Sequence, residues 1–193
     1  MEEMKIMDIP WGSDESKKFA TNVGLITSNG PHGHNVMAAE WTHHVSYSPG
    51  LIMVNVGFDK ATEANIKKTK EFGVSLAATD QNILTSIAGN SSGKEVDKIG
   101  ALKEMGAELY KAKKIDVMMV KGASLSAECK LVKMEKLGDH MMFVGEVVDL
   151  KATEKDSIIY AKGKYWKLGD NMPRPDAEVI EKINKVIEKH KKK

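Results

Sequence analysis

The sequence predicts a mainly β protein whose core is an antiparallel barrel with a few inserted helices. Short apolar runs separated by turn residues fill most of the first half of the chain, which is typical of strands. Two longer apolar runs joined by a tight turn fill much of the second half, which indicates a hairpin. Strands and helices do not alternate in a regular series, so a doubly wound parallel sheet is disfavoured.

The first half of the chain contains most of the predicted strands. We expect strands over residues 22–28, 35–41 and 51–57, with the turn signals NGPHG and SPG between them. A helix is expected over residues 60–71, and a further strand over residues 72–79. Strands therefore dominate this half of the chain.

The middle of the chain predicts two further helices. The first begins with Asp80 as its N-cap and stops at Gly89. The polar loop NSSGKEVDK then leads into a helical segment that ends near Gly106. Both helices interrupt the series of strands.

A long hairpin and a terminal helix complete the chain. The hairpin strands are expected over residues 116–135 and 141–152, joined by the turn LGDH. The terminal helix follows Pro173 and takes Asp176 as its N-cap. Its apolar residues recur at helical spacing, so it needs a partner surface; they are Val179, Ile180, Ile183, Val186 and Ile187.

Composition and charge exclude several classes of protein. A chain of 193 residues buries roughly 70% of its unfolded surface, so a core forms without disulfides or metals. The net charge is only +2, which argues against a nucleic-acid partner, and the terminal KHKKK is interpreted as a solvated helix end. The single cysteine, Cys129, forms no disulfide within the chain and indicates a reducing compartment.

The sequence shows neither the pattern of a secretory signal peptide nor that of a membrane-spanning helix. The start MEEMKIMDIPWG carries acidic residues where a signal peptide has basic ones, and no apolar run of about 18 residues occurs. We therefore expect a cytoplasmic protein with no membrane partner.

The common catalytic motifs are absent. There is no GxGxxG, GxxxxGK[ST], HExxH, CxxC or GxSxG sequence, which disfavours Rossmann domains, P-loop enzymes, zincins and α/β-hydrolases. His32 and His34 form an HxH pair, but no third ligand is spaced nearby, so we interpret the segment as a turn and predict no metal site.

The remaining polar residues are suited to a planar cofactor that carries a phosphate. The small side chains of Ala38 and Ala39 let a ring approach a strand backbone. Short donors follow on a strand, loop and helix start, where an anion is favoured; they are Ser46, Ser48, Thr62 and Asn65. For each of these residues alone, a helix cap or an ordinary turn is an equally good interpretation.

The order of these segments resembles a known family. NVMAAEWT, SYSPGLIMVNV, the TxxNI segment, FGVSLA and SSGKEVDK together resemble the flavin reductase-like FMN-binding split-barrel family, which includes flavoredoxins and ferric reductase-like flavoproteins. The resemblance runs from about Val23 to Trp166. It implies a Greek-key split barrel over residues 1–170, a helical extension over residues 171–193, and a homodimer that binds FMN in a groove between its subunits.

The resemblance also implies which residues contact FMN. The isoalloxazine would lie along a strand and its main-chain groups, at Asn35, Met37, Ala38, Ala39, Glu40, Trp41 and Thr42. The ribityl chain and phosphate would be held by Ser46, Ser48, Lys60, Thr62 and Asn65. A strand end and a loop would complete the site, with Asn55, Val56, Gly57, Ser92, Gly93, Asp97 and Lys98.

Two further positions have less specific signals. His140 matches a position at which the family often has a histidine on the nicotinamide side of the flavin, and a surface hairpin residue is the other interpretation. Trp166 resembles a closing aromatic residue of the site, and packing against the barrel is its alternative.

The expected function is that of an NAD(P)H-dependent flavin reductase. Electrons would pass from NADH or NADPH through bound FMN to a flavin, a ferric complex or a protein acceptor, because the flavin itself carries the chemistry. Two alternatives remain at this point. One is an FMN-holding electron carrier without pyridine-nucleotide activity, and the other is a non-redox protein that binds a different phosphate ligand.

Overall fold

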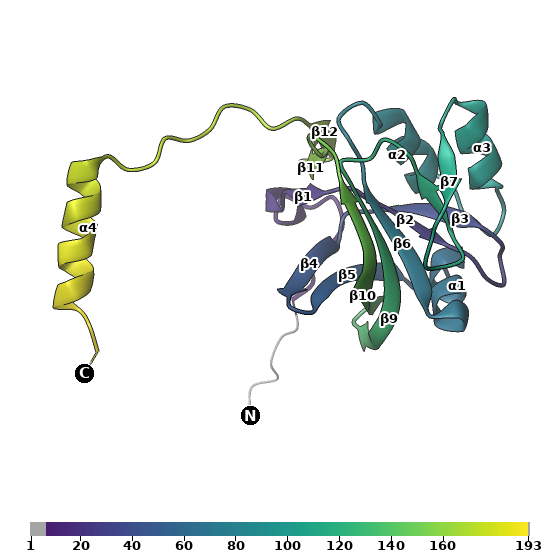
Figure 1. Cartoon of the computed structure of the whole chain (residues 1–193), viewed down its shortest axis with the longest axis horizontal. Coiled ribbons are helices and arrows are strands. Elements are labelled where there is room, and N and C mark those ends of the chain that lie inside the picture. Colours follow the sequence, from purple (N-terminus) through teal and green to yellow (C-terminus); the bar gives the residue numbers. More distant parts are fainter. Residues whose placement is uncertain (1–6, 193) are drawn as a thin grey trace.

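The computed structural model describes residues 7–192, and its largest element is a seven-stranded antiparallel sheet. In spatial order the sheet contains β3 (Asn35–Ala39), β2 (Gly24–Ser28), β6 (Glu71–Leu76), β9 (Leu125–Leu137), β10 (His140–Ala152), β5 (Gly50–Gly57) and β4 (Thr42–Tyr47). The two edge strands, β3 and β4, are neighbours in the chain, and the sheet curls strongly between them (Figure 1). The predicted mainly β, antiparallel fold class is confirmed.

Smaller elements surround this sheet. The strands β1 (Thr21–Asn22), β11 (Ile159–Ala161) and β12 (Lys164–Trp166) form one small sheet, and β7 (Leu109–Lys111) pairs with β8 (Met118–Val120) in another. The helical elements are η1 (Ser16–Lys18), α1 (Ala61–Thr69), α2 (Asn82–Gly89), α3 (Lys98–Glu104) and α4 (Ala177–Lys189). Helices α2 and α3 lie against β3, whereas α4 stands far from the sheet (Figure 1).

The alternation of side chains along β5 explains where the core forms. Ile52, Val54 and Val56 point to the inner face and are buried with Phe72 and Phe143 in the main apolar cluster. A second cluster under α2 and α3 contains Leu25 and Leu102, among others. The core therefore lies inside the curled sheet and between the sheet and its two covering helices.

The predicted hairpin is confirmed, but its first strand is shorter than expected. β9 and β10 pair antiparallel and turn at Gly138, whose φ of 55° suits a tight turn. The run predicted over residues 116–135 is divided into β8 and β9, because Gly122 adopts a φ of 79° in a turn between them. Strand β4 was not predicted, since its sequence THHVSY is polar and mostly exposed.

One predicted helix cap is wrong and another is confirmed. The N-cap of α2 is Gln81 rather than Asp80, because the Asp80 carboxylate binds the Lys155 ammonium at 2.7 Å instead. The N-cap of α4 is Asp176, whose carboxylate accepts a hydrogen bond of 2.9 Å from the main-chain N–H of Val179.

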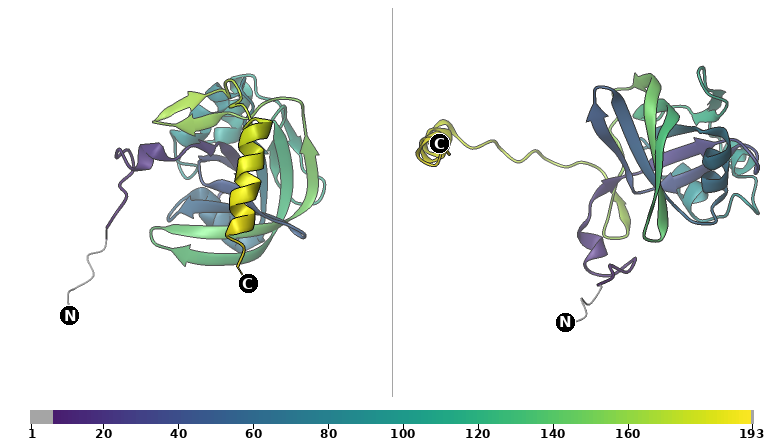
Figure 2. Two further views of the ribbon diagram at one scale, coloured as in Figure 1. Left: turned by 90° about the vertical axis from the view of Figure 1, so that its left-hand side faces the viewer. Right: turned by 90° about the horizontal axis from the view of Figure 1, so that it is seen from below.

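The chain beyond β12 leaves the rest of the molecule. Residues 167–176 run in extended form as an arm, and α4 lies at its end, apart from the sheets (Figure 2). Within residues 7–192, no helix combines the length and the apolar character needed to cross a membrane.

We predict that the close packing around Gly145 limits what this position tolerates. An added Cβ would lie 2.6 Å from Cζ of Phe72 and 2.7 Å from Cβ of Cys129, inside the main core. Gly145→Ala should therefore lower the free energy of unfolding by about 1–3 kcal/mol in urea titrations. Gly169→Ala is the control, because nothing lies within 4 Å of its Cβ position, and equal stability of both variants would contradict this account of the core.

Candidate functional site

The end of β5, the start of α1 and the start of β10 meet at Gly57. Gly57 pairs with His140 in the sheet, and α1 begins a few residues after β5 ends. A Cβ added at Gly57 would lie 3.7 Å from both Nε2 of His140 and Cε of Lys60. The missing side chain therefore leaves space between a cationic lysine and an imidazole ring.

The first turn of α1 faces this region without a side-chain cap. Its N-cap, Lys60, is extended and makes no capping hydrogen bond. As at every helix start, the main-chain N–H groups of Ala61, Thr62 and Glu63 have no intrahelical acceptor. Together with the helix dipole they favour an anion at this position, and the Lys60 ammonium adds to that preference.

Asn35 joins β3 to the same helix turn. Its Nδ2 donates a hydrogen bond of 2.8 Å to Oγ1 of Thr62, and both side chains are buried. Its Oδ1 is buried but has no hydrogen-bond partner among the described residues. The Cβ position of Gly93 lies 2.1 Å from this oxygen, so the loop of residues 92–97 approaches with no room for a side chain.

Lys98 is a buried cation beside this cluster. Its side chain is only 3% exposed, and its Nζ donates a hydrogen bond of 2.7 Å to the main-chain oxygen of Ala88. Burial, together with the nearby charge of Lys60, lowers the pKa of Lys98 to about 8. An anionic group bound near these two lysines would relieve their repulsion.

An aromatic and acidic group borders the other side of Gly57. The rings of Trp41 and His140 lie 4.6 Å apart between centroids, and Trp41 is 45% exposed. Oδ1 of Asp139 lies 2.6 Å from Nδ1 of His140, and this hydrogen bond lowers the pKa of Asp139. The sequence reasoning did not select Asp139, although its position next to His140 was the available signal.

Eight of the predicted residues lie around the end of β5 and the start of α1. The main-chain N–H of Asn55 donates a hydrogen bond of 3.0 Å to the oxygen of Trp41, which holds β5 against the segment after β3. The Oδ1 of Asn55 has no partner within residues 7–192 and lies on the face of β5 opposite the core. The predicted residues gathered around Gly57 and α1 are Asn35, Trp41, Asn55, Lys60, Thr62, Gly93, Lys98 and His140.

Two predicted residues lie at the opposite end of β5. Ser46 pairs with Leu51, and Ser48 belongs to the turn between β4 and β5. Gly57 is six residues further along β5 than Leu51, which corresponds to about 20 Å of strand. Within one chain, these serines are therefore not part of the cluster around α1.

The Asn65 side chain bonds to the turn between β2 and β3 and not to a ligand position at the start of α1. Its Nδ2 donates hydrogen bonds of 3.2 Å to Oγ of Ser28 and 2.9 Å to the main-chain oxygen of Gly33. Its Oδ1 accepts a hydrogen bond of 3.0 Å from the main-chain N–H of His32. Because both amide hydrogens are used within the protein, Asn65 fixes the turn between β2 and β3. His32 and His34 are exposed on that turn.

Most other predicted residues have contacts within the fold. The side chain of Thr42 is buried and donates to the oxygen of Ala39, and Val56 lies in the main core. The Asp97 carboxylate caps α3 by accepting from the main-chain N–H of Gly100 at 2.9 Å. The indole N–H of Trp166 donates to the oxygen of Ala161 at 2.8 Å within its own hairpin.

The remaining predicted residues also have roles within the fold, and they are Met37 and Ala38 of β3, Glu40 after β3, and Ser92 in the loop before α3. Met37 packs against the main core and Ala38 against the second cluster. Desolvation raises the pKa of Glu40, although a hydrogen bond with Trp11 opposes the shift. The hydroxyl of Ser92 accepts a hydrogen bond of 3.2 Å from the main-chain N–H of Lys94 and so shapes the loop before α3.

Two hollows of the surface lie away from the start of α1. A shallow one of about 480 Å³ is lined by Glu71 and residues 111–116, and a small one of about 60 Å³ lies beside Thr42 and His44. Neither is lined by Lys60, Lys98 or His140.

Comparison with known proteins gives a consistent result. Residues 16–169 match the model of a family described as the flavin reductase like domain. An uncharacterized protein of Archaeoglobus fulgidus is 33% identical over 154 residues, which is 76% of this chain and 84% of that protein. An NADH-dependent FAD reductase of Streptomyces globisporus is 26% identical and covers 83% of each chain.

A solved structure has a similar fold. The flavoredoxin of Methanosarcina acetivorans superposes with a TM-score of 0.74 and 23% identity, over 90% of this chain and 95% of that one. The residues gathered around Gly57 and α1 all fall inside the matched range of 16–169.

We predict that burial of Lys98 makes stability depend on pH. Its folded pKa of about 8 lies below its ordinary value, so the unfolded chain binds more protons between about pH 8 and pH 10. The wild type should therefore gain unfolding free energy over this window relative to Lys98→Met. Urea titrations at both pH values test this, with Lys103→Met on the same helix as control, and a difference that does not change with pH would contradict it.

Proposed function

Because the chain belongs to the family of flavin reductase-like domains, we propose that it is an FMN-binding oxidoreductase that accepts electrons from NADH or NADPH. A free flavin, a ferric complex or a protein would be the acceptor. The observation that carries the proposal is the uncapped first turn of α1, flanked by two lysines and placed beside Trp41 and His140. The NADH-dependent FAD reductase of Streptomyces globisporus supports a pyridine-nucleotide donor.

The residues of the site fit a flavin mononucleotide. The N–H groups of α1 and the Lys60 ammonium suit a phosphate dianion, and the Thr62 hydroxyl is free to donate to it. The unpartnered Oδ1 atoms of Asn35 and Asn55 offer acceptors for ring or ribityl hydrogens. Trp41 offers an exposed ring face beside the space at Gly57.

The chemistry would be divided between cofactor and protein. FMN, when bound, supplies the redox chemistry. With Asp139 holding Nδ1, His140 presents Nε2 on the side of Gly57, where it would orient the nicotinamide. Trp41 lies against the same imidazole, with its ring centroid 4.6 Å from that of His140. Lys98 and Lys60 would stabilise negative charge at the phosphate of the bound cofactor.

We also propose a homodimer in the cytoplasm. Leu51, Met53 and Met142 lie half-buried on the outer face of the sheet next to the unpartnered Asn55, which supports coverage by a second copy. Ser46 and Ser48, about 20 Å of strand away from Gly57, would then reach FMN from that copy. The single thiol, Cys129, is buried, which raises its pKa to about 12 and suits a reducing compartment.

An anaerobic reduction experiment tests this function. Protein mixed with FMN and freed of excess should retain a flavin band near about 450 nm, and NADH or NADPH should bleach it within seconds to minutes. Parallel samples with FAD and riboflavin test the choice of flavin. Retention of none of the flavins would contradict the proposal. If the flavin is retained but neither nucleotide bleaches it, the protein would instead be an electron carrier that receives its electrons from another protein.

A single lysine substitution tests where the phosphate binds. Lys60→Met should raise the Kd for FMN about tenfold, because a charge-assisted hydrogen bond to the phosphate is lost, and should leave riboflavin binding unchanged. Lys68→Met removes an exposed lysine further along the same helix and serves as the control. If Lys60→Met and Lys68→Met bind FMN equally well, the phosphate does not lie at the start of α1.

A further inference from the structure

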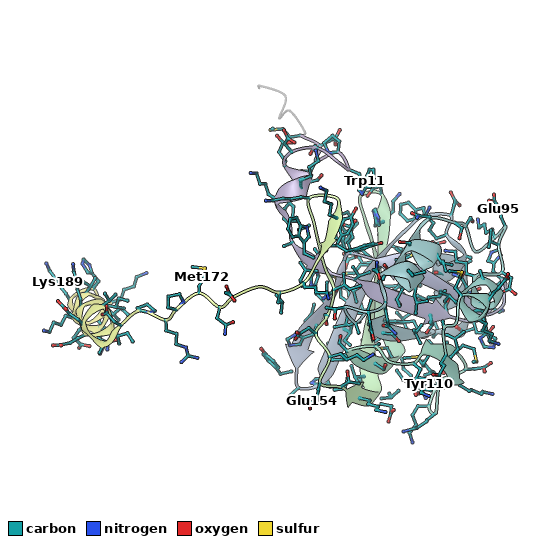
Figure 3. All side chains as sticks on the ribbon, turned by 90° about the horizontal axis from the view of Figure 1, so that it is seen from above. Trp11, Glu95, Tyr110, Glu154, Met172 and Lys189 are labelled. Carbon is teal, nitrogen blue, oxygen red and sulfur yellow. The ribbon has the colours of Figure 1, made fainter. Side chains whose placement is uncertain are left out.

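Helix α4 is amphipathic but packs against none of the other elements that the structure describes within residues 7–192. Every residue from 162 to 192 is exposed, including all of the arm and all of α4. Figure 3 shows Met172 on the arm and Lys189 on α4, both well away from the body formed by the sheets and the other helices. The apolar side chains of α4 are 43–57% exposed; they are Val179, Ile180, Ile183, Val186 and Ile187.

A helix of this length requires a partner surface. An isolated helix of thirteen residues is marginal in water, and most helical stability in proteins comes from packing of the apolar face. The arm contains Pro173 and Pro175, which keep it extended and limit its return to the body. The arm and helix are therefore arranged to engage something beyond their own body.

The body offers an uncovered strand edge on the side nearer α4. β3 and β4 are the two edges of the large sheet, and β3 is covered by α2 and α3. β4 carries Val45 and Tyr47, which are 52% and 90% exposed, and it pairs only with β5 among the described strands. Proteins commonly protect such an edge by covering it with a helix. In Figure 1, β4 lies on the left side of the body, which is the side that faces α4.

We propose that α4 of one copy covers the β4 edge of a second copy of this chain, and that the exchange is reciprocal. A twofold dimer forms both contacts at once, since each copy supplies one helix and one edge. The proposal extends the homodimer suggested above but does not depend on flavin binding.

The pattern of side chains in α4 favours this occupant over two others. Its apolar stripe contains adjacent pairs at 179–180 and 186–187, which makes it broader than the narrow seam of a coiled coil. The charged residues of α4 are three glutamates and three lysines, so its polar face is not strongly basic, unlike that of helices that bind anionic membranes. They are Glu178, Glu181, Glu188, Lys182, Lys185 and Lys189.

The dimensions suit a stable dimer. The ten-residue arm spans up to about 33 Å, and α4 is about 20 Å long with a footprint of roughly 200 Å². Two docked helices, counting both surfaces, would bury roughly 800 Å², and the two arms would add a similar area. The total of roughly 1,600 Å² equals that of a standard stable interface.

Paired cysteine variants test the contact between copies. Tyr47→Cys in one full-length chain and Ile183→Cys in a second, differently tagged chain are co-expressed and oxidised mildly. We expect a disulfide-linked heterodimer to form at least roughly tenfold faster than with Lys185→Cys, which lies on the opposite face of α4, because docking raises the effective thiol concentration. The native Cys129 is buried and its pKa is raised, so it does not compete.

Three outcomes would overturn the proposal. One is equal cross-linking by the Ile183→Cys and Lys185→Cys chains. Another is an intrachain disulfide in a Tyr47→Cys/Ile183→Cys double variant diluted below the dimer Kd, which would place α4 on its own body. The third is hydrogen-exchange protection of α4 in the unmodified chain that appears only with phosphatidylserine vesicles. The expected result is protection without vesicles, lost in Ile183→Lys and kept in Glu188→Gln.

Discussion

The hydrogen bonds of Asn65 determine where the candidate site forms. This buried amide ties α1 to the turn between β2 and β3 through Ser28, His32 and Gly33. Since β3 begins immediately after that turn, the same bonds set the position of Asn35 against Thr62. The first turn of α1, the Gly93 loop and the start of β3 therefore form one connected unit, to which Lys60 and Lys98 add positive charge. The free N–H groups and the two lysines of this unit favour an anion, which is the basis of the proposed phosphate site.

Local patterns predicted much of the fold. The strand over residues 51–57, the LGDH turn and the Asp176 cap follow from rules that act within a few residues, and each was found as expected. Two of the errors come from contacts distant in sequence, whereas the division of the long strand into β8 and β9 comes from the local conformation of Gly122. Lys155 draws Asp80 away from the cap of α2, and the polar edge strand β4 gains its structure from pairing with β5.

The candidate site shows the same division. The sequence identified Thr62 as a short donor at a helix start, and the family resemblance added Lys60 and Lys98. It could not distinguish Asn65, whose amide hydrogens are used inside the fold, from Asn35, whose oxygen is unpartnered. Nor could it fix the register that separates Ser46 and Ser48 from Gly57, because that depends on the pairing of β4 with β5. Burial and register are properties of the whole fold.

A crystal structure of the protein with FMN tests the central claim most directly. The account predicts the phosphate at the first turn of α1, within hydrogen-bond distance of Lys60 and Thr62, and the ring near Trp41 and His140. A phosphate bound at Ser46 and Ser48 of the same chain, with the first turn of α1 empty, would contradict it.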